Sequence, residues 1–519
     1  MNSAAVRGRR SLPVLGSPEA AAPSSPAHGD EDAVRIGVIT LGCDKNTVDT
    51  ERTLARLAHA GARVQSGAGD VDVLVVNTCG FIDAAKEESI ETILDAIRLK
   101  QNGEVRAVVA MGCLVQRYKS ELETEIPEVD LFLGLTEAER LVPTLRARGI
   151  LPAQPPVSMM EQPLRLLSTH QRHTSYLKIS EGCDHTCAFC AIPLMRGKHR
   201  STPMHVLVQE AQQLAERGVV ELNIISQDTS WYGRDLARGD VEDDQAYFVG
   251  KPFAGMAGPM PSPGASAGLV TIPDAPAIPR HGLLPELLRS LISETDVAWF
   301  RLFYMYPSGI SRELVDLIAR EPRLLPYLDM PLQHGSDEIL RRMRRPERKA
   351  TIRERVQWLR DAIPDLTLRT TVIVGFPGES DDDFEQLCDL LEEIRFDRVG
   401  AFTYSPEENT SAASMADMVP DDLKRERLER LMDIQRTITL ERNEAWIGRG
   451  VPVLIDEVTG RDTGMDGDDG RGAIGRTQGQ AIEVDGVVHI ADAPHVEAGT
   501  FVNVRITDAT EDDLAGVLV

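Results

Sequence analysis

The sequence predicts an α/β protein with three consecutive units: a parallel α/β domain, a partial (β/α)6 barrel, and a small β-barrel. Two observations carry this prediction. From residue 34 to about residue 420, short runs of β-branched residues alternate with helical patterns, which is typical of parallel sheets. From residue 448 onward, short strands separated by Gly- and Asp-rich turns replace that pattern, as in small barrels.

The composition indicates a globular protein that is not a membrane protein. Of 519 residues, 42% are hydrophobic, and no apolar run reaches the roughly 20 residues that a membrane-spanning helix needs. Seven cysteines are an odd number and a small share for a disulfide framework, so we expect reduced thiols and a cytoplasmic location. We also expect a monomer.

The charge restricts the class of partner. A formal net charge of -25 argues against general electrostatic binding of nucleic acid, because phosphate binding relies on Lys and Arg. A basic protein partner would suit such a surface, and solubility alone is the other explanation.

Three segments break the alternating pattern. Residues 1–33 are rich in Ala, Pro and Ser and are expected to form a disordered tail. Residues 151–173 contain several prolines and no periodic pattern, and we interpret them as a linker. Residues 233–282 are rich in Pro and Gly with an acidic patch, and we interpret them as a disordered surface insertion.

In the first unit, residues 34–150, three strands end in the same way. The runs VRIGVITLGC, VDVLVVNTC and RAVVAMGC place Cys43, Cys79 and Cys113 just past a strand and just before a helical segment. The carboxyl ends of parallel strands share one edge of a sheet, so the three thiols can converge on a metal site there. The alternative is that each is a small buried hydrophobic residue, as most free cysteines are.

Helical periodicity supports this topology, and it also indicates that Cys388 does not belong to the metal site. Ile90, Ile93, Leu94 and Ile97 fall at i, i+3, i+4 and i+7, which predicts a helix that buries this face on the sheet. Cys388 lies on a helical face with other apolar residues and is expected to be core.

The second unit, residues 174–420, contains six strand-like runs: TSYLKIS, VVELNIIS, AWFRLFY, PYLDMPL, LTLRTTVIVGF and RVGAFTYS. Helical patterns at 206–217, 283–293, 347–362 and 380–394 separate most of them. Six β/α units fall short of the eight in a closed TIM barrel, so we expect a partial barrel with its active site at the strand ends.

A C-x3-C-x2-C motif lies directly after the first of these strands. Cys183, Cys187 and Cys190 provide three thiolates but not the fourth ligand of a closed zinc or iron–sulfur site. Thiolates favour iron–sulfur over hard metals, and a three-cysteine cluster leaves one iron open to an external ligand. A structural zinc site is the alternative, but no fourth Cys or well-spaced His completes one nearby.

The third unit begins after a predicted helix at 421–447, whose buried side carries Leu428, Leu431, Ile434 and Ile438. Residues 448–519 then show the runs VPVLIDEV, AIEV, VVHI, FVNVRI and AGVLV. This barrel has five Arg and no Lys against fourteen acidic residues, so 5 - 14 gives -9. An RNA-binding barrel should be basic.

The motifs EGCDHTCAFC, LGCDKNTVDTE, VNTCGFIDAAKEESIETI, YLDMPLQHGS and VGFPGE resemble those of a known family over roughly residues 34–519. The three-cysteine motif resembles the radical S-adenosylmethionine (SAM) superfamily. The whole arrangement looks like the methylthiotransferases within it, which end in a TRAM barrel, and the segment after Cys79 is most similar to their RimO type.

The resemblance implies two [4Fe-4S] clusters and SAM as cofactors. Cys183, Cys187 and Cys190 would hold the cluster that generates the 5'-deoxyadenosyl radical from SAM, and Cys43, Cys79 and Cys113 an auxiliary cluster that carries the sulfur. The implied reaction adds a methylthio group to the β-carbon of an aspartate in the twelfth protein of the small ribosomal subunit. It also needs an electron donor and a sulfur donor.

Weaker candidates for contacts with SAM lie at the ends of the barrel strands. Phe189 precedes the third cysteine and could stack near the adenine, or could be a core aromatic residue. Gln227 and Asp228 follow the second strand, at the rim where barrel enzymes place functional groups. Gly375 and Gly378 follow the fifth strand and could let the backbone approach the nucleoside.

Two alternatives stay open from the sequence. A tRNA adenosine methylthiotransferase of the MiaB type has a similar plan, but it would call for a basic terminal barrel. A non-catalytic iron–sulfur electron carrier or scaffold is the alternative from a different class of protein.

Overall fold

In the computed structural model, residues 33–153, 164–167, 172–236, 282–460 and 472–519 are described. The predicted tail and most of the 233–282 insertion therefore lie outside the described residues, as does part of the predicted linker. Within the described segments, no helix combines the length and the apolar character needed to cross a membrane.

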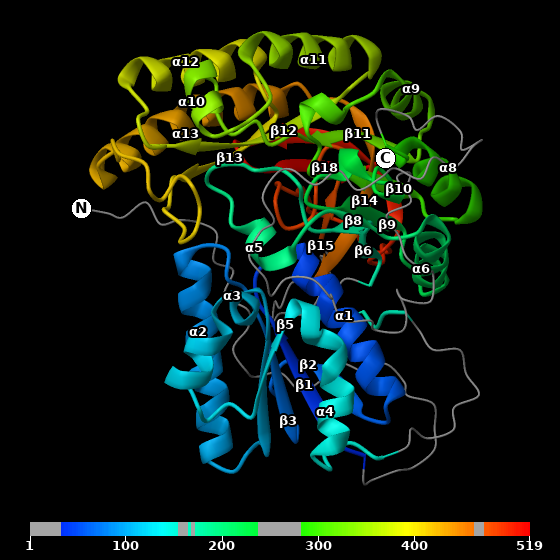
Figure 1. Cartoon of the computed structure of the whole chain (residues 1–519). Coiled ribbons are helices and arrows are strands. Elements are labelled where there is room, and N and C mark those ends of the chain that lie inside the picture. Colours follow the sequence, from blue (N-terminus) through cyan, green and yellow to red (C-terminus); the bar gives the residue numbers. More distant parts are fainter. Residues whose placement is uncertain (1–32, 154–163, 168–171, 237–281, 461–471) are drawn as a thin grey trace, which may run out of the picture.

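The N-terminal unit is a five-stranded parallel sheet in the order β2-β1-β3-β4-β5, covered by helices on both faces (Figure 1). Every residue of β3 and β4 is buried, because parallel strands between two helical layers have no solvent face. The elements are β1 Arg35–Thr40, α1 Asp44–His59, β2 Arg63–Ser66, β3 Val73–Thr78, α2 Asp83–Gln101, β4 Ala107–Gly112, α3 Cys113–Glu125, β5 Leu131–Gly134 and α4 Leu141–Ala147.

Two apolar cores hold these layers together. On one face of the sheet α1 and α4 pack through residues such as Leu57 and Leu145, and on the other α2 and α3 pack through Ile93 and Leu122. The predicted helix after Cys79 is present, but the prediction that Leu94 is buried is wrong, since 39% of that residue is exposed. The buried face of α2 is centred on Ile93 and Ile97, which leaves Leu94 at its edge.

The middle unit is a parallel six-stranded sheet in the order β13-β12-β11-β10-β9-β6, so β6 and β13 are its open edges. The partial barrel predicted from six β/α repeats is thus confirmed. Its strands are β6 Thr174–Lys178, β9 Glu221–Ile225, β10 Trp299–Leu302, β11 Leu324–Asp329, β12 Thr367–Val374 and β13 Arg398–Thr403.

Helices form the outer layer of this unit, in an arc over the top and down the right-hand side of Figure 1. They include α6 Met204–Glu216, α8 Leu284–Glu294, α9 Arg312–Arg320, α10 Asp337–Arg342, α11 Lys349–Ala362 and α12 Asp381–Ile394. The short helix α5 Ile192–Arg196 lies instead next to the N-terminal unit, where Met195 packs with Cys113 of α3. Cys388 on α12 is buried in the core between helices and sheet, as predicted.

The C-terminal unit is a closed barrel of β14 Gly450–Thr459, β15 Gly472–Arg476, β16 Val488–Ile490, β17 Phe501–Ala509 and β18 Leu514–Leu518. Helix α13, Asp421–Glu444, precedes it and buries Leu431 and Ile438. The prediction of a strand at AIEV is wrong. Residues 481–484 form a turn in which Glu483 has a φ of 66°, and Ala481 packs against the middle unit instead.

Buried ion pairs join the units. Arg165, from the predicted linker, is fully buried and pairs with Glu51 of α1 and Glu210 of α6. Arg476 of the barrel pairs with Glu221 of β9 at 2.7 Å.

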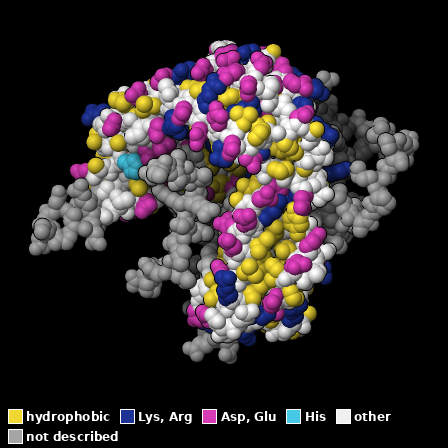
Figure 2. Space-filling model, turned by 90° about the vertical axis from the view of Figure 1, so that its left-hand side faces the viewer, with side chains coloured by type: hydrophobic (Ala, Val, Ile, Leu, Met, Phe, Trp, Pro, Cys, Tyr) yellow, Lys and Arg dark blue, Asp and Glu magenta, His cyan; other side chains and the backbone are white. Residues whose placement is uncertain are grey.

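On the side that carries α2 and α13, basic and acidic side chains are mixed over the upper part of the molecule, and an apolar strip runs along the lower part (Figure 2).

Candidate active site

Cys43, Cys79 and Cys113 lie at one edge of the N-terminal sheet. Cys79 directly follows β3, Cys113 is the first residue of α3 after β4, and Cys43 precedes α1. The strands β1, β3 and β4 are neighbours in parallel register, so their carboxyl ends meet at that edge. Cys79 and Cys113 are buried and Cys43 is exposed.

Two residues of the motif LGCDKNTVDTE, Gly42 and Asn46, bring these cysteines close together. Gly42 has a φ of +94°, and a Cβ there would lie 2.7 Å from the Cβ of Cys79, so only glycine fits between the two strand ends. The amide of Asn46 donates to the carbonyls of Leu41 and Thr78, at 2.8 and 3.1 Å. Its Oδ1 lies 3.7 Å from the Cys113 thiol, so Asn46 contacts all three strand ends.

A cation from the middle unit reaches this group. Arg196, at the end of α5, donates to Oδ1 of Asn46 at 2.6 Å and pairs with Asp49 and Glu181. Burial raises the pKa of the Cys79 thiol and raises that of Cys113 to about 12, while the Arg196 guanidinium acts in the opposite direction on both. Arg196 therefore favours the thiolate form that a metal cluster requires.

Cys183, Cys187 and Cys190 lie in the loop after β6, at the rim of the middle unit. Gly182 has a φ of +71°, and a Cβ there would clash with the carbonyl of Lys198. The loop is fixed by bonds from the amide of Cys183 to Gly197 and from the amide of Ala188 to Met343. Burial raises the pKa of the Cys183 and Cys190 thiols to about 12.

Two further side chains contact the second cysteine of this motif. The Tyr306 hydroxyl lies 3.7 Å from Sγ of Cys187, and Nη1 of Arg345 lies 3.8 Å from the same sulfur. The Arg345 guanidinium also stands 4.0 Å from the centroid of the Tyr306 ring. Each cysteine group thus has a buried arginine beside it, Arg196 in one case and Arg345 in the other.

The weaker candidates lie around the same rim. Asp228 is fully buried and hydrogen-bonds Nε2 of His185, inside the motif, at 2.7 Å. Gln227 is half-buried beside it, and Phe189 is half-buried against a cluster that includes Phe376. The amide of Gly375 donates to Glu379 at 2.8 Å, so Gly375 follows its strand as expected. Their roles toward SAM stay predictions.

Gly378 has a φ of +80°, and a Cβ at that position would clash with the Arg342 guanidinium. The Arg342 side chain could move aside, so it is the positive φ that favours glycine here, whatever its part in nucleoside binding.

The sequence-based prediction missed four residues around the cysteines: Asn46, Arg196, Tyr306 and Arg345. Asn46 is three residues from Cys43 and Arg196 is six residues from Cys190, so proximity in the sequence was an available signal for both. Arg345 is 158 residues from Cys187 in the chain, and only the folded structure brings them together.

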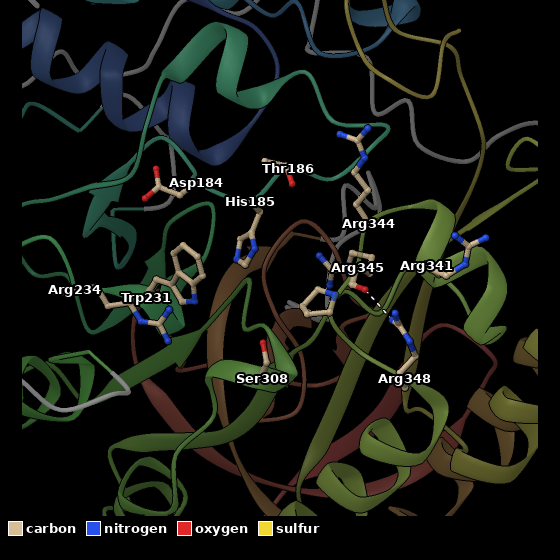
Figure 3. A pocket seen from close by; sticks show the side chains of 11 residues that line it. Asp184, His185, Thr186, Trp231, Arg234, Ser308, Arg341, Arg344, Arg345 and Arg348 are labelled. Carbon is tan, nitrogen blue, oxygen red and sulfur yellow. Dashed lines mark hydrogen bonds between the residues drawn. The ribbon is translucent and has the colours of Figure 1, made fainter. Parts of the chain in front are cut away.

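A cleft of about 530 Å³ opens beside the second cysteine group (Figure 3). Its wall includes the three residues between Cys183 and Cys187, namely Asp184, His185 and Thr186. The other lining residues come from the segments that follow β9 and β10, from α10, and from the segment between α10 and α11: Trp231, Arg234, Ser308, Arg341, Arg344, Arg345, Pro346 and Arg348.

The donor sets fit iron–sulfur clusters. The first group offers three thiols at three strand ends and the second offers three thiols in one loop, and each has one arginine to offset thiolate charge. In the described part of the chain, no three His, Cys, Asp or Glu side chains are spaced to hold a single metal ion. A cluster does not require such a common point, because each thiolate binds a different iron atom.

The parallel six-stranded sheet with C-x3-C-x2-C after its first strand defines a radical SAM enzyme, and residues 177–391 match the model of the Radical SAM superfamily. Membership of this superfamily implies an iron–sulfur cluster and SAM as cofactors. Residues 35–134 match the model described as Uncharacterized protein family UPF0004, and residues 447–519 match the TRAM domain.

Two curated relatives match nearly the whole chain. The chain is 42% identical over 487 residues to "Ribosomal protein uS12 methylthiotransferase RimO" of Desulforudis audaxviator, covering 93% of this chain and 96% of that protein. It is 41% identical over 488 residues to the protein of the same name from Anaeromyxobacter sp., covering 93% of each. The chain belongs to the RimO family of radical SAM methylthiotransferases.

Proposed function

We propose that this enzyme adds a methylthio group to the β-carbon of an aspartate of uS12, the twelfth protein of the small ribosomal subunit. The observation that carries the proposal is the identity of about 40%, over 93% of the chain, to relatives named uS12 methylthiotransferases. Those relatives favour the ribosomal protein over tRNA as substrate, as does the acidic C-terminal barrel.

The two cysteine groups support a division of labour. We infer that Cys183, Cys187 and Cys190 hold a [4Fe-4S] cluster with one iron open to SAM, and that Cys43, Cys79 and Cys113 hold a second [4Fe-4S] cluster. When bound, these groups supply a radical able to abstract hydrogen from an unactivated carbon, together with the sulfur and methyl group to be transferred.

The chain's own residues would position and shield this chemistry. Arg196 and Arg345 offset the charge of the thiolates on which each cluster is held. Asp228 orients His185 within the cysteine loop through their hydrogen bond. Phe189, Gln227, Asp228 and Gly375 at the rim are the residues we expect to contact SAM.

The proposal includes partners and a location. A basic ribosomal protein, free or within the small subunit, suits an enzyme with a net charge of -25. The reaction further needs an electron donor and a sulfur donor, and we place the enzyme in the cytoplasm as a monomer.

The decisive experiment compares the intact mass of uS12 from a wild-type strain and from a strain in which this gene is deleted. We expect the mass increment of one methylthio group to disappear on deletion and to return on complementation. An increment that survives deletion would refute the proposed substrate. Loss of a methylthio-adenosine from tRNA hydrolysates of the same strain would instead support the tRNA enzyme.

A second experiment separates the two cysteine groups. Simultaneous replacement of Cys183, Cys187 and Cys190 by Ala should leave about half of the iron and abolish formation of 5'-deoxyadenosine from SAM with dithionite. Cys388→Ala is the matched control, because Cys388 is packed among apolar side chains, and its iron content should equal that of the wild type. Full iron content in the triple variant would contradict the two-cluster arrangement.

A further inference from the structure

We propose that the arginine-lined cleft beside Cys183 and Cys187 is the docking surface for a small acidic protein that carries single electrons. The inference rests on the proposed function, since it concerns the cluster that the motif would hold. One electron passes from the reduced carrier to that cluster and the carrier is oxidised by one electron. No covalent bond forms or breaks at the surface.

The charge of the cleft is opposite to that of the chain. Five arginines and one aspartate line it, so 5 - 1 gives +4, and the carboxylates paired with two of the arginines, Glu338 and Glu347, lower this to +2. The whole chain, by contrast, has 56 basic and 81 acidic residues. The arginines stand around the cleft, Arg234 on one side and Arg341, Arg344 and Arg348 on the other (Figure 3). This local charge would attract an acidic partner despite the net negative charge elsewhere.

Several of these charges are not neutralised by carboxylates. Arg348 donates to the backbone carbonyls of Arg345 and Glu347, at 2.9 and 2.5 Å, which leaves its charge in place. Arg344 is exposed, and among the described residues no carboxylate pairs with it. Arg341 pairs with Glu338, and Arg345 with Glu347. Arg344 and Arg348 therefore keep charges in the cleft lining that can interact with a partner.

A stack of rings connects the cleft wall to the cysteine group. The ring centroids of Trp231 and His185 are 4.2 Å apart, and those of His185 and Tyr306 are 4.1 Å apart with nearly parallel planes. The Tyr306 hydroxyl then lies 3.7 Å from Sγ of Cys187. These contacts give a continuous packed path from the cleft to the thiol, and electron transfer through packed groups is faster than through a solvent gap of equal length.

The same features disfavour the other partners of the enzyme at this cleft. The proposed substrate is a basic protein and would be repelled by the arginines, whereas the acidic barrel would attract it. RNA would also be attracted by a cluster of arginines, but phosphate binding gives no reason for a path of rings that ends on Cys187.

The test is charge reversal with the assembled enzyme, both clusters loaded. The double variant Arg344→Glu with Arg348→Glu reverses two of the positive charges that line the cleft. The single variant Arg344→Glu avoids any effect on the start of α11, because Arg348 directly precedes that helix. Arg425→Glu with Arg436→Glu is the matched control, because both arginines are exposed on α13. The probe is reduced flavodoxin, an acidic FMN protein, and dithionite serves as the reductant that needs no docking.

The readouts are the dissociation constant for flavodoxin and the ratio of flavodoxin-driven to dithionite-driven formation of 5'-deoxyadenosine. In the cleft variants we expect flavodoxin binding to weaken and the ratio to fall by about 10-fold at low salt, with a smaller difference at high salt. The control variant should keep both values. Iron content and thermal unfolding check that each variant is folded and loaded.

Unchanged binding and an unchanged ratio in the cleft variants would overturn the proposal. So would loss of binding to a labelled oligouridylate with the ratio intact, which would assign the cleft to RNA. Because 5'-deoxyadenosine forms from SAM without the ribosomal protein, these outcomes are independent of the uS12 mass measurement. Failure of the docking proposal is therefore distinguishable from failure of the proposed substrate.

Discussion

Replacing Arg196 by methionine tests whether this side chain stabilises the contact between the N-terminal and middle units, which carry the two groups of cysteines. The Arg196 side chain is 1% exposed and comes from the middle unit, whereas its partners Asp49 and Asn46 lie on α1 of the N-terminal unit. Methionine keeps much of the apolar stem and removes the cation, so Asp49 and Glu181 lose one of their two basic partners. Lys178 remains as the other partner of both.

The expected cost follows from burial. Removing one member of a buried ion pair costs about 3–5 kcal/mol, because the remaining charge stays desolvated. Since Lys178 still offsets part of the charge of both carboxylates, we take the lower end, about 3 kcal/mol. At 1.4 kcal/mol for each factor of ten, this is about a 100-fold rise in the population in which the two units have separated.

Hydrogen exchange followed by mass spectrometry measures this opening directly, without assuming two-state unfolding of a chain with several units. Peptides from α1 should exchange about 100-fold faster in Arg196→Met. Arg52→Met is the matched control, since Arg52 is 23% exposed and its partner Glu210 also pairs with Arg165. It should change exchange by less than about fivefold. Equal exchange of α1 in the two variants would refute the reasoning.

Two further predictions concern the strand ends and the barrel contact. Gly42→Ala should lose about half of the iron, because its Cβ would lie 2.7 Å from that of Cys79, whereas Gly67→Ala should keep its iron, since its φ is also positive but the space around it is open. Equal iron content in the two variants would contradict this. Arg476→Met should lower the free energy of unfolding by about 3–5 kcal/mol at neutral pH, because the buried carboxylate of Glu221 loses one of its two arginine partners. Burial alone would raise the pKa of Glu221, but Arg476 and Arg301 hold it below its ordinary 4.5. The ion pair therefore stabilises the fold above pH 4.5 and its contribution is lost as the pH falls further, so the difference between variant and wild type in denaturant midpoint should shrink there. A difference independent of pH would be evidence against this role.

The two large parallel sheets could be predicted because most of their central strands are buried on both faces. Such strands appear in the sequence as continuous apolar runs, as in Val73–Thr78 and Ala107–Gly112. The edge strand Arg63–Ser66 was not predicted, because an exposed strand with the sequence RVQS carries no such pattern. At AIEV the apolar residues indicated a strand. The positive φ of Glu483 is incompatible with an extended backbone there, and Ala481 is buried against the middle unit.

The candidate site was predictable to the extent that it lies in local motifs. The placement of Cys43, Cys79 and Cys113 at one sheet edge followed from parallel topology, and the loop of Cys183 followed from its position after the first barrel strand. Arg345 was not predictable, since it meets Cys187 only after the chain has passed through β9, β10 and β11. Spacing predicts ligands that are close in sequence, and does not predict a cation such as Arg345 that comes from a distant segment.

The ion pairs of α1 have a consequence for how the chain assembles during synthesis. The ribosome completes residues 35–151 before it makes Arg165, Arg196 or Glu210, and N-terminal units generally fold first. Glu51 and Asp49 are then carboxylates in water. Glu51 becomes buried, and Asp49 becomes half-buried, when their counter-ions arrive from later segments. A misaligned joining of the two units would trap these charges without partners, at a cost of several kcal/mol. The carboxylates of α1 thus favour the arrangement of the two units in which Arg165 and Arg196 reach them.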